Sequence, residues 1–404
     1  MTVGRFGNSS AIARPYTAGM AEVAHSSELL SIGAELLLGE TVDTNAAYLG
    51  AELATLGLPL SRVTQLPDER TVIATAFTDA RRRCAVVIAT GGLGPTHDDV
   101  TREGLADALG EELTLDRVLR RTLEERYSAF GPMPASNLRQ AMRITSAEAV
   151  DNPIGSAPGW WVDRDGVVAV LMPGVPSEMR RMWSERVRPR LATRFAAEPL
   201  AVRSVKAFGV GESAAAEKLG ALLDRPPRGV DVGIYARDDG IHVRFSTAGD
   251  GAVLDPLIAE ARAALGDDAY GADTDDLAVA ALRALGRAGV GSLASWEAGT
   301  EGALLAILAA APTIDGAARY VGGILDAGGA SGPPIADAVL QVSLLPQDAN
   351  GRSRVRVALS GGVSLPQAEL RIHGSGPQRK RRAAFAALDA VRRIDGGGRR
   401  PNAA

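Results

Sequence analysis

Few residues that carry covalent or metal chemistry occur in this chain of 404 residues. There is one cysteine, Cys84, which excludes an internal disulfide and any zinc site built on several cysteines. The four histidines are scattered and do not have the spacing of a metal-binding motif. Cys84 begins an apolar run, which indicates a buried thiol that packs as a small hydrophobic side chain.

Two further absences limit the class of protein. No run of eighteen consecutive apolar residues occurs, which argues against a membrane-spanning helix. The formal net charge is −4, which argues against general binding to nucleic acid through a basic surface. Residues 1–27 lack the apolar core of a signal peptide, so we expect a disordered leader, with Met1 or Met20 as the start. These features predict a cytoplasmic protein.

Short apolar runs alternate with segments of helical periodicity in the first half of the chain. The runs at 29–33, 60–64 and 85–89 predict strands, and the segments 44–56 and 71–82 predict the helices between them. This alternation predicts an α/β fold with a parallel, doubly wound sheet. In such a sheet, ligands bind at the carboxyl ends of the strands.

The most informative stretch is 90–101, which reads Thr-Gly-Gly-Leu-Gly-Pro-Thr-His-Asp-Asp-Val-Thr. It follows the strand predicted at 85–89 and precedes a helix predicted at 102–109. Glycines allow the backbone to approach a phosphate, and the start of a helix adds partial positive charge. Asp98 and Asp99 supply hard oxygen ligands for a divalent cation. The stretch predicts a phosphate-and-metal site, although a plain turn with a capping aspartate fits the glycines equally well.

The rest of the chain divides into two further α/β segments. A small domain is predicted by strands at 202–207, 230–236 and 241–246 and by helices at 211–223 and 252–265. A third domain opens and closes with helices at 277–288 and 378–393 and has strands at 321–325 and 355–359 between them. The expected division is a leader at 1–27, domains at 28–198, 199–272 and 275–395, and a disordered tail at 396–404.

Four motifs in order resemble those of the CinA family of competence/damage-inducible proteins. They are 31–40 with Asp43-Thr44-Asn45, then 90–101, 152–159 and 173–179. The resemblance implies a doubly wound MoaB/MogA-like, molybdopterin-binding fold for the first domain. It implies a small KH-like connecting domain next, which includes Gly209-Val210-Gly211-Glu212-Ser213, and then an α/β amidase-like domain.

In the CinA family, the first domain is associated with metal-dependent hydrolysis of ADP-ribose to AMP and ribose 5-phosphate. The resemblance implies that Asp99 holds the metal, that Asp98 assists, and that glycine N–H groups of the turn stabilise charge on the phosphoryl oxygens. Glu35 and Asp43 are candidates for a second ligand or a water-orienting base, while Asp43 fits a helix cap equally well. The implied cofactor is Mg²⁺ or Co²⁺, with K⁺ as an additional candidate.

The candidate catalytic residues are Asp99, Asp98 and Glu35, and Asp98 and Asp99 are also the candidate metal ligands. The candidate substrate-binding residues are Gly33, Asp43, Asn45, Thr90, Gly91, Gly92, Gly94, Thr96, Thr101, Gly155, Pro173 and Gly174.

The expected partner is a phosphorylated nucleotide or a pterin small molecule, and the resemblance implies a homodimer. Two other functions stay open, a molybdopterin- or nucleotide-binding module without turnover and a scaffold in competence or DNA repair. Direct nucleic-acid binding is not expected, because Gly209-Val210-Gly211-Glu212 lacks the GxxG spacing and basic flanks of a KH clamp.

The third domain departs from the family in its amidase motifs. Ala298 stands where the family has the serine nucleophile, and a methyl group cannot form an acyl intermediate. Ala327 and Gly332 stand where the family has its activating Tyr and Lys, and the ligand loop at 343–348 has lost its glycines. We therefore expect deamidase activity on nicotinamide mononucleotide to be lost and the domain to persist for oligomer contacts or stability.

Overall fold

The computed structural model describes residues 26–128, 131–326, 335–348 and 351–394. These residues belong to two compact units, and the boundary between them in the chain lies between Ala201 and Val202. Each unit is described separately below. Most of the expected leader, including Met20, and the expected tail at 396–404 lie outside the described residues. Within the described residues, no helix has the length and apolar character that crossing a membrane requires.

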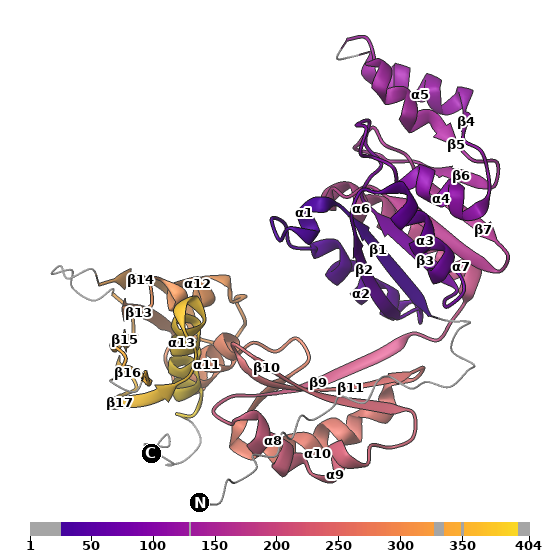
Figure 1. Ribbon diagram of the computed structural model, residues 1–404. Coiled ribbons are helices and arrows are strands. Elements are labelled where there is room, and N and C mark those ends of the chain that lie inside the picture. Colours follow the sequence, from indigo (N-terminus) through magenta and orange to yellow (C-terminus); the bar gives the residue numbers. More distant parts are fainter. Residues whose placement is uncertain (1–25, 129–130, 327–334, 349–350, 395–404) are drawn as a thin grey trace, which may run out of the picture. The chain divides into compact units, whose positions relative to one another are not determined.

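A six-stranded sheet in the order β2-β1-β3-β8-β7-β6 forms the centre of the first unit (Figure 1). Its parallel part consists of β2 (Leu60–Leu66), β1 (Ser27–Ile32), β3 (Val86–Thr90) and β8 (Val167–Met172). Its antiparallel part consists of β7 (Gly159–Arg164) and β6 (Ala147–Val150). The predicted parallel strands are present, but the sheet is mixed.

The antiparallel extension, which the sequence prediction omitted, begins at a two-residue turn. Arg164 pairs with Val167, so Asp165 and Gly166 alone connect β7 to β8. Both have positive φ, 56° and 80°, which is the backbone of the hairpin turn that Asp-Gly favours. The chain therefore reverses before β8, and β8 joins the sheet as the fourth parallel strand.

Helices cover both faces of this sheet, as expected for a doubly wound fold. One face carries α3 (Arg70–Ala80) and α4 (Thr101–Leu109), and the other carries α2 (Thr44–Thr55), α6 (Pro176–Met182) and α7 (Arg188–Phe195). Successive strand residues point to opposite faces. Leu30 accordingly packs in the core on the α3 side, and Leu29 packs in the core on the α2 side.

The sequence predicts that the helix opened by the stretch 173–179 ends near Arg188, before Pro189, but the helical segment continues to Phe195, so the predicted end is wrong. A π-helical segment, η3 (Trp183–Val187), lies between α6 and α7. Pro189 then occupies the first turn of α7, where its missing N–H is tolerated. The wider turn thus lets the chain stay helical through a proline.

Smaller elements complete the first unit. They are α1 (Ala34–Leu37), β4 (Thr114–Leu115), α5 (Arg117–Tyr127), the 3₁₀ helix η2 (Ala135–Ala141) and β5 (Met142–Arg143).

The second unit begins with a four-stranded sheet in the order β10-β11-β9-β12 (Figure 1). Its strands are β9 (Leu200–Ala207), β10 (Val230–Arg237), β11 (Gly240–Ala248) and β12 (Ala269–Ala272). Its helices are α8 (Glu212–Leu219), α9 (Ala221–Asp224), the 3₁₀ helices η4 (Gly251–Leu254) and η5 (Gly266–Asp268), and α10 (Asp255–Leu265). The single helix predicted at 211–223 is divided at Gly220, whose φ is 42°.

A five-stranded sheet in the order β14-β13-β15-β16-β17 follows in the second unit. Its strands are β13 (Ser292–Ala298), β14 (Arg319–Leu325), β15 (Ala338–Leu344), β16 (Ser353–Gly361) and β17 (Leu365–Ile372). Its helices are α11 (Leu277–Arg287), α12 (Ala303–Ala310) and α13 (Gly376–Arg392). Residues 383–391 of α13 are all buried and contribute to the core of this sheet.

Two glycines in helix interiors predict opposite effects of the same substitution. A Cβ added to Gly50 in α2 meets only the end of the Leu60 side chain, at 3.3 Å, whereas one added to Gly104 in α4 comes 2.5 Å from Ile73 Cγ2 in α3. Gly50→Ala should therefore stabilise the first unit by up to about 1 kcal/mol. Gly104→Ala should destabilise it by about 1–3 kcal/mol because α3 and α4 must separate. Urea unfolding of both variants measures the difference, and a stabilising Gly104→Ala would contradict the packing.

Candidate functional site

A cavity of about 460 Å³ lies at the carboxyl ends of the central parallel strands of the first unit. Gly33 follows β1, residues 91–95, 98 and 99 follow β3, and Pro173 and Gly174 follow β8, and all of them contribute to its lining. Three of the four motifs that resemble the CinA family thus meet at one edge of the sheet, together with Ser156 and Ala157 of the fourth. This is where a parallel sheet positions a ligand.

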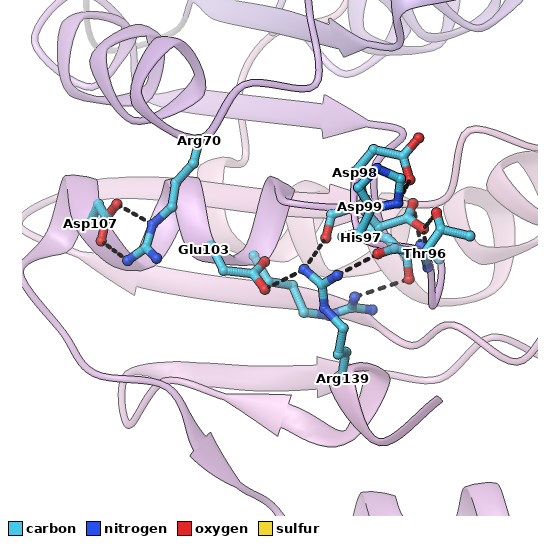
Figure 2. Close-up of polar contacts among 11 residues, drawn as sticks. Arg70, Thr96, His97, Asp98, Asp99, Glu103, Asp107 and Arg139 are labelled. Carbon is cyan, nitrogen blue, oxygen red and sulfur yellow. Dashed lines mark hydrogen bonds and ion pairs between the residues drawn. The ribbon is translucent and has the colours of Figure 1, made fainter. Parts of the chain in front are cut away.

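The carboxylate of Asp99 closes the glycine turn (Figure 2). Its Oδ1 accepts a hydrogen bond from the N–H of Gly94 at 2.7 Å, and its Oδ2 accepts from the N–H and the hydroxyl of Thr96 at 2.8 and 2.5 Å. Both oxygens are therefore engaged within the loop. Asp99 therefore orders the turn in the structure.

The first two glycines of the turn are required by close packing. Gly91 has a φ of 100°, and a Cβ there would lie 2.0 Å from the carbonyl oxygen of Ile32. Gly92 has a φ of 63°, and a Cβ there would lie 2.2 Å from the Thr101 hydroxyl. The N–H of Gly91 donates to the carbonyl of Met172 at 3.1 Å. Of the N–H groups expected to face a phosphate, those of Gly91 and Gly94 thus donate within the chain instead.

Two arginine side chains donate hydrogen bonds to the backbone of the loops that form the site. Arg102, which is 2% exposed, donates to the carbonyls of Leu93 and Pro158, each at 3.0 Å, and burial lowers its pKa to about 10. Arg139 donates to the carbonyls of Thr96 and Asp99 and to the Glu103 carboxylate (Figure 2). Neither arginine contributes to the described lining of the cavity. The guanidinium groups therefore fix the loop backbone and leave the cavity to other side chains.

Five carboxylates line the cavity, namely Glu35, Asp68, Asp98, Asp99 and Glu178. The Thr96 hydroxyl, followed by the loop backbone, holds the pKa of Asp98 below its usual range. Burial raises the pKa of Asp68, and the charges of Glu35, Asp98 and Asp99 raise it further. No Lys, Arg or His occurs among the described lining residues. The cavity is therefore strongly acidic.

Asp68 was missed in the sequence analysis. It lies just beyond the end of β2, and its Oδ2 accepts the N–H of Ala34 at 2.9 Å, which fixes the backbone after β1. The sequence could have indicated Asp68 as a site residue, because β2 ends at the same edge of the sheet as β1 and β3.

Glu178 belongs to a recognised motif but was given no role in the sequence analysis. Its Oε2 accepts the side-chain amide of Asn152 at 2.7 Å, and the Asn152 oxygen accepts the N–H of Gly155 at 2.9 Å. A Cβ at Gly155 would lie 2.1 Å from Glu178 Oε2. Gly155 thus makes room for a carboxylate of the cavity, although it does not line the cavity itself.

Six predicted substrate-binding residues do not line this cavity: Asp43, Asn45, Thr90, Thr96, Thr101 and Gly155. Asp43 caps α2 by accepting the N–H of Ala46 at 2.9 Å, which is the structural alternative that the sequence left open. Asn45 donates to the carbonyl of Gly174 at 2.8 Å, and Thr101 donates to that of Gly91 at 2.9 Å. These side chains support the turns that form the cavity.

The donors of the cavity fit a hard divalent cation, since every charged lining group is a carboxylate. Within the described residues, no three His, Cys, Asp or Glu side chains are grouped as they would be to enclose a metal ion. Mg²⁺ is commonly bound by one or two carboxylates together with substrate phosphates and water. The residues present therefore fit a cation that arrives with a phosphate ligand.

The turn after β13, which was aligned with the amidase motif, caps the N-terminus of α12 in the structure. Ala298 ends β13, and Glu297, which is 1% exposed, accepts the hydroxyl of Thr300 at 2.6 Å and the N–H groups of Leu304 and Leu305. The nearby Ser295 is buried against the Tyr320 hydroxyl at 2.7 Å. The predictions for Ala327 and Gly332 lie outside the described residues.

Comparisons with known proteins agree with these features. A family model described as "Probable molybdopterin binding domain" matches residues 28–193, and one described as "Damage-inducible protein CinA KH domain" matches 202–271. A CinA-like protein of Thermomicrobium roseum is 41% identical over 291 residues, which are 70% of this chain and 71% of that protein. A CinA-like protein of Deinococcus deserti is 43% identical over 298 residues, 71% of each chain.

Solved structures also match this chain, each over less than half of its length. A CinA protein of Thermoplasma acidophilum is 33% identical and covers 40% of this chain and 94% of its own, with a TM-score of 0.38. A molybdopterin biosynthesis protein of Mycobacterium abscessus is 18% identical and covers 43% and 95%, with a TM-score of 0.30.

Arg139 and Arg70 provide a matched test of how the turn is held (Figure 2). Arg70 forms an exposed pair with Asp107 on α4, and such pairs contribute at most about 1 kcal/mol. Arg139→Ala removes bonds to two loop carbonyls and should cost about 1–3 kcal/mol. Hydrogen exchange should accelerate at the amides of Gly94 and Thr96 in Arg139→Ala and stay unchanged in Arg70→Ala. Equal hydrogen-exchange rates at these amides in both variants would contradict the role of Arg139 in holding the turn.

Proposed function

The chain belongs to the CinA family, and we propose that its first unit is a metal-dependent hydrolase of a nucleotide-sugar pyrophosphate. The proposed substrate is ADP-ribose, and the products are AMP and ribose 5-phosphate. One observation carries the proposal: a glycine turn and five carboxylates line the same cavity, with no cationic side chain in the described lining. A pyrophosphate can be held beside so many carboxylates only when a cation lies between them.

Asp98 is the primary candidate to hold that cation, because it is exposed and its pKa is lowered, so it stays ionised. Asp99 is in reach from the same turn but also keeps the loop closed. The bound cation would neutralise charge on the pyrophosphate and lower the pKa of a water. Glu35 in α1 and Asp68 after β2 also line the cavity and are candidates to orient that water.

A second function, binding of a pterin or nucleotide phosphate without turnover, is favoured by the state of Asp99. Its two oxygens accept three hydrogen bonds from the turn, so their main role in the structure is to order the loop (Figure 2). The matched family model is described as a molybdopterin-binding domain, which supports the same alternative.

Release of AMP from ADP-ribose tests the hydrolase. The purified protein should release AMP with Mg²⁺ or Co²⁺, assayed with and without K⁺, and EDTA should abolish the release. Asp98→Asn should reduce kcat by about 100-fold because the ligand charge is lost. Glu112→Gln, an exposed carboxylate outside the cavity, should leave kcat unchanged. Folded protein that binds ADP-ribose and metal without turnover would favour the binding module.

We propose further that the third domain has no deamidase activity on nicotinamide mononucleotide. The protein should release no ammonia from this substrate under conditions in which an active deamidase does. Ala298→Ser should not restore release, because Glu297, the only carboxylate in the motif's strand, is occupied by the helix cap. Ammonia release by the unaltered protein would contradict the proposal and direct attention to Ser295.

A further inference from the structure

A second cavity, of about 380 Å³, lies in the second unit, where the four-stranded sheet meets β17 and α13. Its wall includes the turn Gly209-Val210-Gly211 before α8 and the hairpin between β10 and β11. Its charged lining residues are Arg237, Arg371, Arg382, His373, Glu212 and Asp238. Whereas every charged group that lines the cavity of the first unit is a carboxylate, arginines outnumber carboxylates among the charged groups of this one.

Three arginines of this cavity lack a side-chain partner among the described residues. The side chains of Arg237, Arg371 and Arg382 make no hydrogen bond or ion pair with any described residue. Asp238 is paired with Arg381, which is not among the lining residues, at 3.1 Å. Glu212 is then the remaining unpaired carboxylate, so the lining keeps a net positive charge even with His373 neutral.

Arg382 lies in a run of cationic side chains. The first two turns of α13 contain four consecutive cationic residues at 379–382, and these like charges repel one another. Lys380 is offset by Glu301, and Arg381 is offset by Asp238. Arg382 has no such offset and contributes to the cavity lining. An anion in the cavity would supply the missing counter-charge.

The backbone at the cavity is also suited to an anion. Gly211 is the N-cap of α8 and provides no side-chain cap for the first N–H groups of the helix. A Cβ added at Gly211 would meet nothing within 4 Å, so the backbone there borders open space. Uncapped N–H groups at a helix N-terminus bind phosphate oxygens readily. The arginines therefore line the same cavity as this helix N-terminus, which favours negative charge.

The remaining lining is apolar and includes the buried side chains of Ile241 and Ile372. We propose that this cavity binds a small organic phosphate, with the phosphate on the arginines and a planar or apolar body against these side chains. The volume lies at the small end of ligand pockets and suits a molecule of mononucleotide size. An extended polynucleotide is disfavoured by Glu212 and by the negative charge of the chain.

Calorimetric titration with uridine 5′-monophosphate in EDTA tests the proposal. Uridine 5′-monophosphate is not a product of the proposed hydrolysis, and EDTA removes the cation that the first cavity needs, so failure of the proposed function leaves this test intact. Arg371→Gln and Arg382→Gln should each weaken binding by at least about tenfold, since each removes a charge-assisted hydrogen bond. Arg319→Gln, an exposed and unpaired arginine of β14 in the same unit, is the matched control.

Binding that is lost in both cavity variants and kept in Arg319→Gln supports the proposal, provided that thermal unfolding shows all variants folded. Absence of binding at millimolar ligand overturns it, as does binding that neither cavity variant weakens. Inorganic phosphate and a ten-nucleotide single strand of thymidylate are titrated in parallel. Tighter binding of the strand than of the mononucleotide, with the same arginine dependence, overturns the small-molecule assignment in favour of a polynucleotide.

Discussion

The buried guanidinium of Arg102 is the constraint on which the site of the first unit depends. It connects the loop after β3 to the loop before β7 through two carbonyls that are far apart in the sequence. Loss of the side chain would leave both carbonyls without a donor in a buried environment, which is costly. Because Arg102 lies in the first turn of α4, the helix, the glycine turn and the loop that carries Ser156 are fixed together. The acidic cavity can therefore keep its shape although its own side chains repel one another.

Much of the fold was predictable because it follows from periodicity. Apolar runs located β1 and β3, since burial on both faces of a sheet leaves a continuous apolar signal. The alternation of short runs with helical periods located β2 and the helices between these strands, although β2 is mostly exposed. The failures have local causes. Asp165-Gly166 formed a hairpin turn that was not recognised between two apolar strands, and Pro189 was taken as a helix end although a π turn accommodates it. Such backbone adjustments depend on neighbouring packing and leave little trace in composition.

The site was predictable where its residues share a motif and not where the fold alone brings them together. Asp98 and the glycines were located from one stretch of sequence, whereas Asp68 stands alone after a strand and Glu178 had no assigned partner. The arginines of the second cavity show the same limit more strongly. Arg237, Arg371 and Arg382 come from three elements, so the residues of the turn at 209–212 by themselves indicated only that basic flanks are missing there. The positive charge beside this turn comes from arginines that are distant in the sequence and that the fold brings to the same cavity.

The position of α13 in the chain has a consequence for how the two units form during synthesis. Domains generally fold as units in the order in which they leave the ribosome. Every strand and covering helix of the first unit is complete by Phe195, so its core can close while the remainder is still being translated. The five-stranded sheet, in contrast, obtains a large share of its core from residues 383–391. Its apolar face stays uncovered until that helix emerges, which makes this sheet the part of the nascent chain most exposed to aggregation and most dependent on chaperones.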